Sequence, residues 1–322
     1  MNELLVSGVA TLLAAPLVLR LMRSQGIIDV PNERSSHTSP VPRGGGLACI
    51  AGIVVALIVA HAQGRVVPWL LLLTVAFLSV VGFADDHRSL SAVSRLAAQV
   101  AAGSYMGWVI GGGWWIVVGM ILAPVVVNIV NFMDGINGIT SLTMAVWGIT
   151  AFAVGQSHAV PSLSLVGALA AGAALGFLPW NAPVARLFLG DAGSYLFGAM
   201  ASVGLLIGWS EGVPVVLLAA PLALYLADTT TVLAKRALRG DPLFEAHREH
   251  VYQRLTSVSG LPHTAVSLAV AVLSAVITLS WMAQVMWVPL ATTALVCSLY
   301  LLAPKLVTRH ATPAASTAGG TL

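Results

Sequence analysis

Carboxylate and amide side chains gather in short stretches of this sequence, at spacings that suit a cation or a phosphorylated ligand. Asp85 and Asp86 are adjacent. Because neighbouring carboxylates repel each other, we expect a divalent cation or a nearby arginine to relieve them. Asn128, Asn131 and Asp134 recur at intervals of three and share one face of a helix. Oxygen atoms on such a face suit a hard cation or a nucleotide.

Each of these stretches also has a purely structural interpretation. The aspartate pair could be a solvated helix end. Hydrogen bonding between membrane helices could explain one asparagine of Asn128, Asn131 and Asn137, but it explains three with an aspartate poorly. Asp191 lies between glycines before an apolar run. It could stand beside helix N-terminal amides that attract phosphate, or it could simply cap the helix.

Basic side chains occur in two further segments. His247, Arg248 and His250 bring together donors that suit a pyrophosphate. Two histidines three apart could instead bind zinc, although no further ligands of the usual kind accompany them, and the segment could also be a solvated loop that touches anionic lipid. Arg43 precedes the glycine run 44–46, which predicts an anion contact at a helix start.

The composition indicates which elements must position these residues. Of 322 residues, 58% are hydrophobic and 8% are charged, whereas soluble domains carry roughly 25% charged residues. This excludes an ordinary soluble fold and nucleic-acid binding through a basic surface. We predict an all-α polytopic membrane protein of 10 or 11 helices, from the apolar runs 4–22, 45–60, 67–83, 96–110, 114–130, 139–154, 163–178, 195–209, 213–226, 264–282 and 286–302.

The charges predict the orientation of these helices. All of the 15 Lys and Arg residues except Arg65 fall in the connections on one side, which is cytoplasmic by the positive-inside rule. All carboxylates except Glu3 and Glu211 lie on the same side, although acidic residues contribute little to orientation. This clustering predicts an active site on the cytoplasmic face. We expect residues 1–310 to form one integral membrane catalytic domain, followed by a disordered tail over 311–322.

Five stretches in the order of a known family carry a resemblance that covers residues 29–256. They read PVPRGGG, ADDHRSLSAVSRLAAQ, NIVNFMDGINGI, FLGDAGSYLFG and DTTTVLAKRALRGDPLFEAHREHVYQRL. The chain resembles the polyprenyl-phosphate N-acetylhexosamine-1-phosphate transferases, glycosyltransferase family 4. The resemblance implies a Mg²⁺-dependent enzyme, with Mn²⁺ as a substitute, that transfers a sugar-1-phosphate from a UDP-amino sugar to undecaprenyl phosphate and releases UMP. It also implies a bacterial inner-membrane location, contact with membrane lipid, no nucleic acid, and compatibility with a homodimer.

The resemblance assigns roles to residues by motif. It implies a catalytic set of Asp85, Asp86 and Asp191, with Asp191 as a metal ligand and Asn131 near the metal. The residues it assigns to substrate binding are Arg43, Arg95, Asn128, Asp134, Asn137, His247, Arg248 and His250.

Two departures from the family pattern narrow the expected subgroup. Many bacterial members have a second aspartate at the position of Asn137, and the HREH motif lacks a run of consecutive histidines. The second departure favours the members that start O-antigen or related surface polysaccharides over the phospho-MurNAc-pentapeptide transferases of peptidoglycan synthesis, which stay the alternative. A polytopic transporter is the rival from another class, but it predicts ionisable groups at mid-membrane and related halves.

Overall fold

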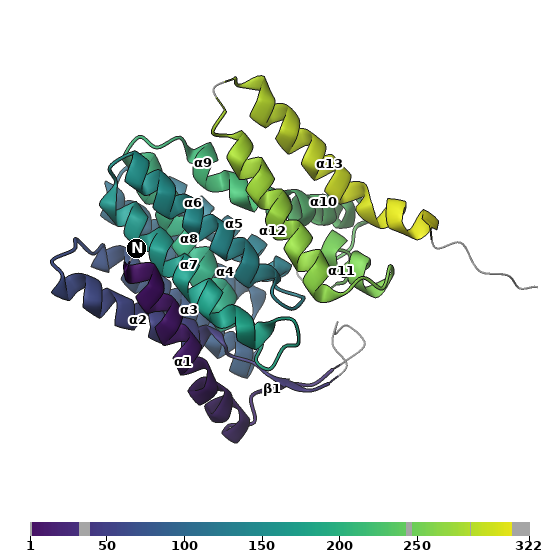
Figure 1. Cartoon of the computed structure of the whole chain (residues 1–322), viewed down its shortest axis with the longest axis horizontal. Helices are drawn as coiled ribbons and strands as arrows, with labels where there is room; N and C mark the ends of the chain where they lie inside the picture. Colours follow the sequence, from purple (N-terminus) through teal and green to yellow (C-terminus); the bar gives the residue numbers. More distant parts are fainter. Residues whose placement is uncertain (1, 32–38, 243–246, 284, 311–322) are drawn as a thin grey trace, which may run out of the picture.

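The protein is a bundle of long helices with one short hairpin (Figure 1). The computed structural model describes residues 2–31, 39–242, 247–283 and 285–310, with side chains up to residue 307. The expected tail over 311–322 lies outside these residues. The elements are α1 (Asn2–Ser24), β1 (Ile28–Asp29), β2 (Val41–Pro42), α2 (Gly46–Ala62), α3 (Trp69–Arg88), α4 (Ala92–Ile110), α5 (Trp114–Met133), α6 (Ile139–Ser157), α7 (Pro161–Asn181), α8 (Gly190–Ser210), α9 (Val215–Ala219), the 3₁₀ turn η1 (Ala220–Leu222), α10 (Ala223–Arg239), α11 (Val251–Ser257), α12 (His263–Ser280) and α13 (Trp287–His310).

The helices are long and apolar enough to cross a membrane, as their sequence predicts. Among the described residues, nine segments have the length and hydropathy of a membrane span, and α2 is a shorter apolar helix. Each predicted apolar run lies within a helix, apart from one or two residues at some ends, except the run 213–226, which spans α9, η1 and the start of α10. Large apolar side chains on the outer helices, such as Leu13 and Leu17 on α1, are exposed for contact with lipid. The prediction of an all-α polytopic membrane protein is confirmed.

Helix α8 forms the centre of the bundle. Of its membrane-length window, 94% is buried, against 17% for α1 and for α13, which lie at opposite flanks (Figure 1). Helix α8 packs mainly against α3 and α5, and the pairs α6–α7, α4–α5 and α1–α2 also pack closely. The start of α8 is therefore a point to which the ends of α3 and α5 bring their side chains.

One span is broken and longer than its apolar run predicts. The run ends near residue 226, but the segment passes from α9 through η1 at Pro221 and continues as α10 to Arg239. A proline cannot donate a backbone hydrogen bond, so it favours a break at this point. Helix α10 buries polar residues on one face, namely Asp228, Thr229 and Arg236. A run defined by apolar residues alone therefore ends before this helix does.

The hairpin lies at the end of the bundle where α1 ends and α2 begins. Strands β1 and β2 are antiparallel, with Ile28 opposite Pro42 and Asp29 opposite Val41. A further bridge pairs Arg43 with Phe188, just before α8. Since successive helices alternate in direction, this end also holds the ends of α3, α5 and α7 and the starts of α4, α6 and α8. The predicted motifs therefore share one end of the bundle.

Candidate active site

Asp85 is fixed at the end of α3 by two donors. Its Oδ2 accepts a hydrogen bond from Arg95 Nη1 at 2.9 Å, and its Oδ1 accepts one from the Leu90 amide at 2.7 Å. The Arg95 side chain stays 29% exposed, so it can also reach a ligand. The Asp85 and Asp191 side chains are close enough to interact electrostatically. Two carboxylates from α3 and α8 therefore meet.

Asp86, the neighbour of Asp85, has a different set of contacts. Its carboxylate accepts the backbone amides of Asp191 at 3.0 Å and Ala192 at 3.1 Å, and Arg43 Nη1 lies 3.4 Å from its Oδ1. Its side chain is fully buried. Asp86 thus caps the N-terminus of α8 from another helix. The expectation that these amides attract phosphate is wrong for the amides of Asp191 and Ala192, because Asp86 already occupies them.

Asp191 is held by polar partners from α5. Asn131 Nδ2 donates to Asp191 Oδ1 at 2.8 Å and to Ser194 Oγ at 2.9 Å. The N-cap position of α8 is Leu189, which makes no side-chain cap hydrogen bond. The interpretation of Asp191 as the helix cap is therefore wrong, and its carboxylate is directed to Asn131 and Asp85 instead.

The charges at this point suit a divalent cation. Three carboxylates, those of Asp85, Asp86 and Asp191, have the two guanidiniums of Arg43 and Arg95 as neighbours, which leaves an excess of negative charge. In the described part of the chain, no three or more His, Cys, Asp or Glu residues form a metal-binding group. Mg²⁺ needs fewer, because it is usually held by one or two carboxylates together with substrate phosphates. The pair of Asp85 and Asp191 fits that requirement.

Two asparagines near the end of α5 form hydrogen bonds with other segments of the chain. Asn128 Nδ2 donates to Gln99 Oε1 of α4 at 2.7 Å and to Pro124 O of its own helix at 2.8 Å, which favours the interpretation as helix-to-helix hydrogen bonding. Asn137 Nδ2 donates to Pro183 O at 3.2 Å, in the connection between α7 and α8.

Asp134 follows α5 directly and is the titratable group of this turn. Burial raises its pKa to about 7, and the negative charge of Asp86 acts in the same direction. A basic or hydrogen-bond-donating ligand would bring the carboxylate back to its ionised form.

The glycine run at the start of α2 has a packing role. The amides of Gly45 and Gly46 donate to Phe188 O at 2.8 Å and to Leu189 O at 2.9 Å. A Cβ atom at Gly46 would collide with the backbone of Gly193 in α8. The expected anion contact at these two amides is therefore wrong, because they join α2 to the segment before α8. Arg43 still reaches the site through Asp86.

The basic-histidine segment lies just before α11. His250 is the N-cap of α11, and its Nδ1 donates to Asp228 Oδ1 at 3.1 Å. The His247 ring lies 5.0 Å from the His250 ring, and burial lowers the pKa of His247, with His250 and Arg236 adding to the effect. Zinc is not supported, because among the described residues these histidines join no larger metal-binding group.

Several buried polar residues of this region are not predicted from the sequence as parts of a site. Asp228 is fully buried and accepts from Tyr300 OH at 2.9 Å, and Tyr252 OH donates to Phe132 O at 3.0 Å. Asp228 stands out only as an acidic residue near the inner end of an apolar run. The two tyrosines occur in unremarkable positions, and only the packing of α11 and α13 brings them here.

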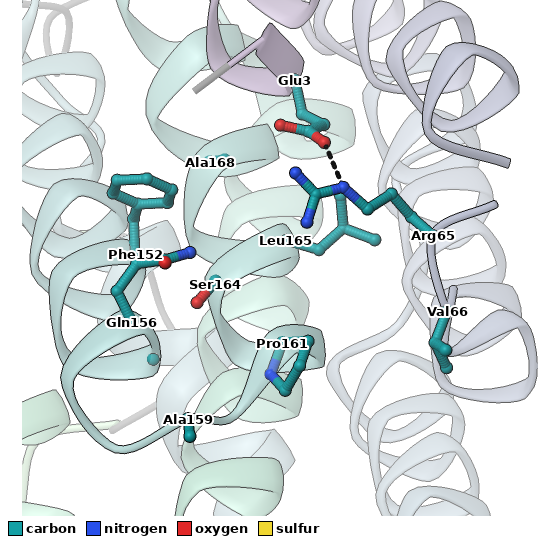
Figure 2. Close-up of a pocket in the computed structure, with 11 residues that line it drawn as sticks. Glu3, Arg65, Val66, Phe152, Gln156, Ala159, Pro161, Ser164, Leu165 and Ala168 are labelled. Carbon is teal, nitrogen blue, oxygen red and sulfur yellow. Dashed lines mark ion pairs between the residues drawn. The ribbon is translucent and has the colours of Figure 1, made fainter. Parts of the chain in front are cut away.

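A cavity lies at the opposite end of the bundle (Figure 2). Its wall includes Glu3, Arg65, Phe152 and Ser164, and Arg65 Nε lies 3.2 Å from Glu3 Oε1. The predicted motifs lie at the other end, so this cavity is not the candidate active site.

Comparisons with known proteins agree with this arrangement. The sequence pattern of glycosyl transferase family 4 matches residues 68–209. The chain is 28% identical to the probable undecaprenyl-phosphate N-acetylglucosaminyl 1-phosphate transferase of Bacillus subtilis (strain 168), over 80% of this chain and 77% of that protein. It is 28% identical to the decaprenyl-phosphate N-acetylglucosaminephosphotransferase of Mycobacterium tuberculosis (strain ATCC 25618 / H37Rv), over 79% and 75%.

A third relative has a different named activity. The phospho-N-acetylmuramoyl-pentapeptide-transferase of Symbiobacterium thermophilum is 32% identical, over 59% of this chain and 67% of that protein. The matched span of the family pattern contains Asp85, Asp86, Asn131 and Asp191, which the fold brings to one place. From the sequence pattern and this relative, the chain is a multi-pass membrane protein that belongs to glycosyl transferase family 4.

Proposed function

We propose that this protein transfers a sugar-1-phosphate from a UDP-N-acetylhexosamine to a polyprenyl phosphate. The observation that carries the proposal is the meeting of the Asp85 and Asp191 carboxylates beside Arg95, at the end of the bundle that holds the charged connections. Such a site suits a diphosphate and a divalent cation. The names of the Bacillus and Mycobacterium relatives describe this type of reaction.

The reaction exchanges one phosphoanhydride bond for another. An oxygen of the polyprenyl phosphate attacks the β-phosphorus of the UDP-sugar, and the bond between this phosphorus and the bridging oxygen breaks. UMP leaves with that oxygen, and the sugar stays on the β-phosphorus, now joined to the lipid as a pyrophosphate. Such transfers depend on positioning and charge neutralisation more than on covalent help.

Different residues would bind the metal ion and the oxygens of the diphosphate. Asp191 and Asp85 would hold Mg²⁺, and Asn131 orients Asp191 through its side-chain amide. When bound, Mg²⁺ neutralises charge on the diphosphate. Arg95 and Arg43 are partly exposed and donate to its non-bridging oxygens.

The remaining residues hold the rest of the donor. His247, Arg248 and His250 bind the diphosphate or the sugar, and Asp134 accepts from the uracil base. Burial raises the pKa of Asp134 in the protein without substrate. A hydrogen bond from the uracil base of the bound UDP-sugar would favour the ionised form of this carboxylate.

Direct attack of the lipid phosphate is the favoured mechanism. This phosphate is already largely ionised near neutral pH, so a general base is not required. An aspartyl-phosphate intermediate is the alternative, and it needs a carboxylate oxygen that is free to attack. Asp86 uses both of its oxygens on the α8 amides, and Asp85 uses its oxygens on Arg95 and the Leu90 amide, which leaves Asp191 for that role.

The acceptor and donor expected here follow from the relatives and from the motif departures. Undecaprenyl phosphate is the acceptor we propose, with the active site on the cytoplasmic face of a bacterial inner membrane. The HREH motif favours an initiating enzyme of O-antigen or related surface-polysaccharide synthesis. Transfer of phospho-MurNAc-pentapeptide is the second candidate, supported by the Symbiobacterium relative.

The test is an assay with purified protein in detergent. The protein is incubated with undecaprenyl phosphate and, separately, with UDP-GlcNAc, other UDP-amino sugars and UDP-MurNAc-pentapeptide, and both UMP and the lipid product are measured. We expect equal amounts of both products with one class of amino sugar, and loss of both with EDTA. Product from the pentapeptide donor alone would select the second candidate, and absence of product with every donor would overturn the proposal.

A further inference from the structure

A buried carboxylate in α10 joins three separate parts of the chain. Asp228 is 0% exposed. Its oxygens accept from His250 Nδ1 at 3.1 Å, from the Val251 amide at 3.0 and 3.2 Å, and from Tyr300 OH at 2.9 Å. A buried carboxylate requires such donors, since burial without them is costly. These contacts fix the start of α11 between α10 and α13.

The same contacts fix the imidazole of His250. Its ring stacks on Tyr252 at 5.7 Å between centroids and lies 5.0 Å from the ring of His247. The backbone of His250 is held in turn, because its amide donates to Gln253 Oε1 at 3.3 Å. With Nδ1 directed to Asp228, the second ring nitrogen, Nε2, is the one left for another partner.

A second anchor sets the position of α11 relative to the site. Tyr252 OH donates to Phe132 O at 3.0 Å, at the end of α5. Gly135 lies under the same tyrosine, and a Cβ atom there would collide with the hydroxyl. Helix α11 is therefore docked on the turn that contains Asp134, and Asp228 fixes the orientation of His250 on that docked helix.

Stability alone is a poor reason for a carboxylate at this position. Apolar side chains of similar volume commonly hold helices together as well as buried ionic groups do, without the desolvation cost. A carboxylate does something that an apolar group cannot, because it orients an imidazole and selects which nitrogen carries the proton. The groups in contact with this imidazole are Asp228 from α10, Tyr252 from α11 and His247 from the preceding segment. Tyr300 acts on it through Asp228, and Arg236 and Glu249 act on the neighbouring His247.

We propose that Asp228, supported by Tyr300, is a positioning residue of the transferase. It holds Nδ1 of His250 so that Nε2 is presented to the diphosphate of the nucleotide donor. This inference rests on the proposed function, in which the basic-histidine segment binds that diphosphate. It adds Asp228 and Tyr300, on two helices outside the histidine motif, to the machinery that binds the donor.

The experiment is a double-mutant cycle on Asp228 and His250 in the full-length protein. The variants are Asp228→Asn, His250→Gln and the double variant, and the control is Thr229→Val. Thr229 is the next residue of α10, it is buried, and its hydroxyl has no hydrogen-bond partner in the described part of the chain. The measurements are the KM for the UDP-sugar, the KM for the polyprenyl phosphate, kcat, and the dissociation constant of UDP by calorimetry with Mg²⁺ present.

We expect Asp228→Asn to raise the donor KM and the UDP dissociation constant by about 10- to 100-fold, the usual scale for removing a group that orients a ligand-binding histidine. The KM for polyprenyl phosphate should stay constant. The double variant should bind UDP no more weakly than His250→Gln, because Asp228 acts through His250. Thr229→Val should match the wild type. A loss confined to kcat, or additive losses in the double variant, would overturn the proposal.

Two further arms keep the test decisive. If Asp228→Asn melts well below the wild type, Tyr300→Phe replaces it, because it removes one hydroxyl donor and should raise the donor KM in the same direction by a smaller factor. If the wild type binds UDP but forms no lipid product, the proposed function fails. The UDP dissociation constants of the variants then still test whether Asp228 acts through His250. If the wild type makes product and Asp228→Asn binds UDP normally, only the positioning role fails.

Discussion

Three aspartates that look alike in the sequence differ in what their oxygens contact. Asp86 gives both oxygens to the amides of α8, Asp85 pairs with Arg95, and Asp191 is oriented by Asn131. An oxygen that already accepts backbone hydrogen bonds is poorly available to a cation or a phosphorus atom. Asp85 also gives Oδ1 to the Leu90 amide, whereas the bond to Asp191 comes from a side chain. At the residue scale we therefore place the metal-binding role first on Asp191, with Asp85 beside it, and a structural role on Asp86.

The first prediction concerns the metal-binding role of Asp191. Asp191→Asn keeps the size and can still accept from Asn131, so the melting temperature should change little. The loss of charge should lower turnover by about 100-fold or more, which corresponds to about 3 kcal/mol of lost transition-state stabilisation. Turnover is measured against Mg²⁺ concentration.

The control for that variant is Ser202→Ala, whose hydroxyl bonds only to the backbone of its own helix at Gly198 O. It should keep wild-type turnover. Near wild-type activity of Asp191→Asn at low Mg²⁺ would overturn the metal assignment.

The second prediction concerns pH and Asp134. Its folded pKa of about 7 lies above the ordinary value of 3.8, so the folded state binds more protons between these values. Its contribution to stability is therefore present at low pH and is lost as pH rises through about 7. Asp134→Asn should flatten the fall of melting temperature between pH 5 and pH 8, measured without donor or metal. An unchanged pH dependence would mean that the Asp134 carboxyl is not desolvated.

The third prediction separates packing from substrate binding at Asn128. Asn128→Ala leaves the buried Gln99 without its partner, so the free energy of unfolding should fall by about 1–3 kcal/mol. The donor KM should stay unchanged, because Asn128 bonds to α4 and to its own helix. A raised donor KM with normal stability would restore the substrate-binding interpretation.

At the scale of elements, the start of α8 is set by side chains of other helices. Asp86 of α3 caps it, Asn131 of α5 contacts its first turn, and the amides of Gly45 and Gly46 bond to the residues before it. Gly82 of α3 lets α8 approach closely, since a Cβ atom there would collide with the backbone of Asp191. The position of Asp191 thus depends on the docking of three helices.

The fourth prediction tests this cap. Asp86→Ala removes the acceptor for two α8 amides and should destabilise the protein by about 1–2 kcal/mol, the usual range for a lost cap. Asp86→Asn can still accept one of these bonds and should recover part of the stability. Thermal unfolding in detergent gives both values. If both variants are as stable as the wild type but inactive, Asp86 takes a direct part in the reaction.

At the scale of the whole molecule, the two ends of the bundle differ in chemistry. One end holds the aspartates, the arginines and the histidine segment, and the other holds the Glu3–Arg65 pair and a cavity. An asymmetry of this kind fixes orientation in a membrane, because Lys and Arg stay on the cytoplasmic side. It also predicts that donor and lipid phosphate meet at the cytoplasmic surface.

The fifth prediction concerns that orientation. A reporter fused after Leu322 should be active only when it is cytoplasmic, and one fused at the N-terminus only when it is outside. A reporter inserted near residue 211, in the short connection after α8, should behave like the N-terminal one. Activity of the C-terminal reporter outside the cell would reverse the orientation and the proposed face of the active site.

The sequence by itself determined the class of fold and predicted part of the candidate site. Apolar runs and basic loops are local in the chain, so they predict membrane helices and their orientation without any tertiary information. The five motif stretches also named Asp85, Asn131 and Asp191, which the fold brings together. Their identity was readable because each motif is contiguous.

Only the tertiary structure decided what each polar group contacts. Asp86 and Asn128 were expected at the substrate, yet one caps α8 and the other pairs with Gln99, because their partners lie on other helices. Asp228 and Tyr300 are 72 residues apart, and neither lies in the histidine motif that they support. A hydrogen bond depends on distance and direction in space, which spacing along the chain does not encode beyond a few helical turns. The tertiary packing of α3, α5, α8, α10 and α13 therefore assigned the roles within a set of residues that the sequence had named only in part.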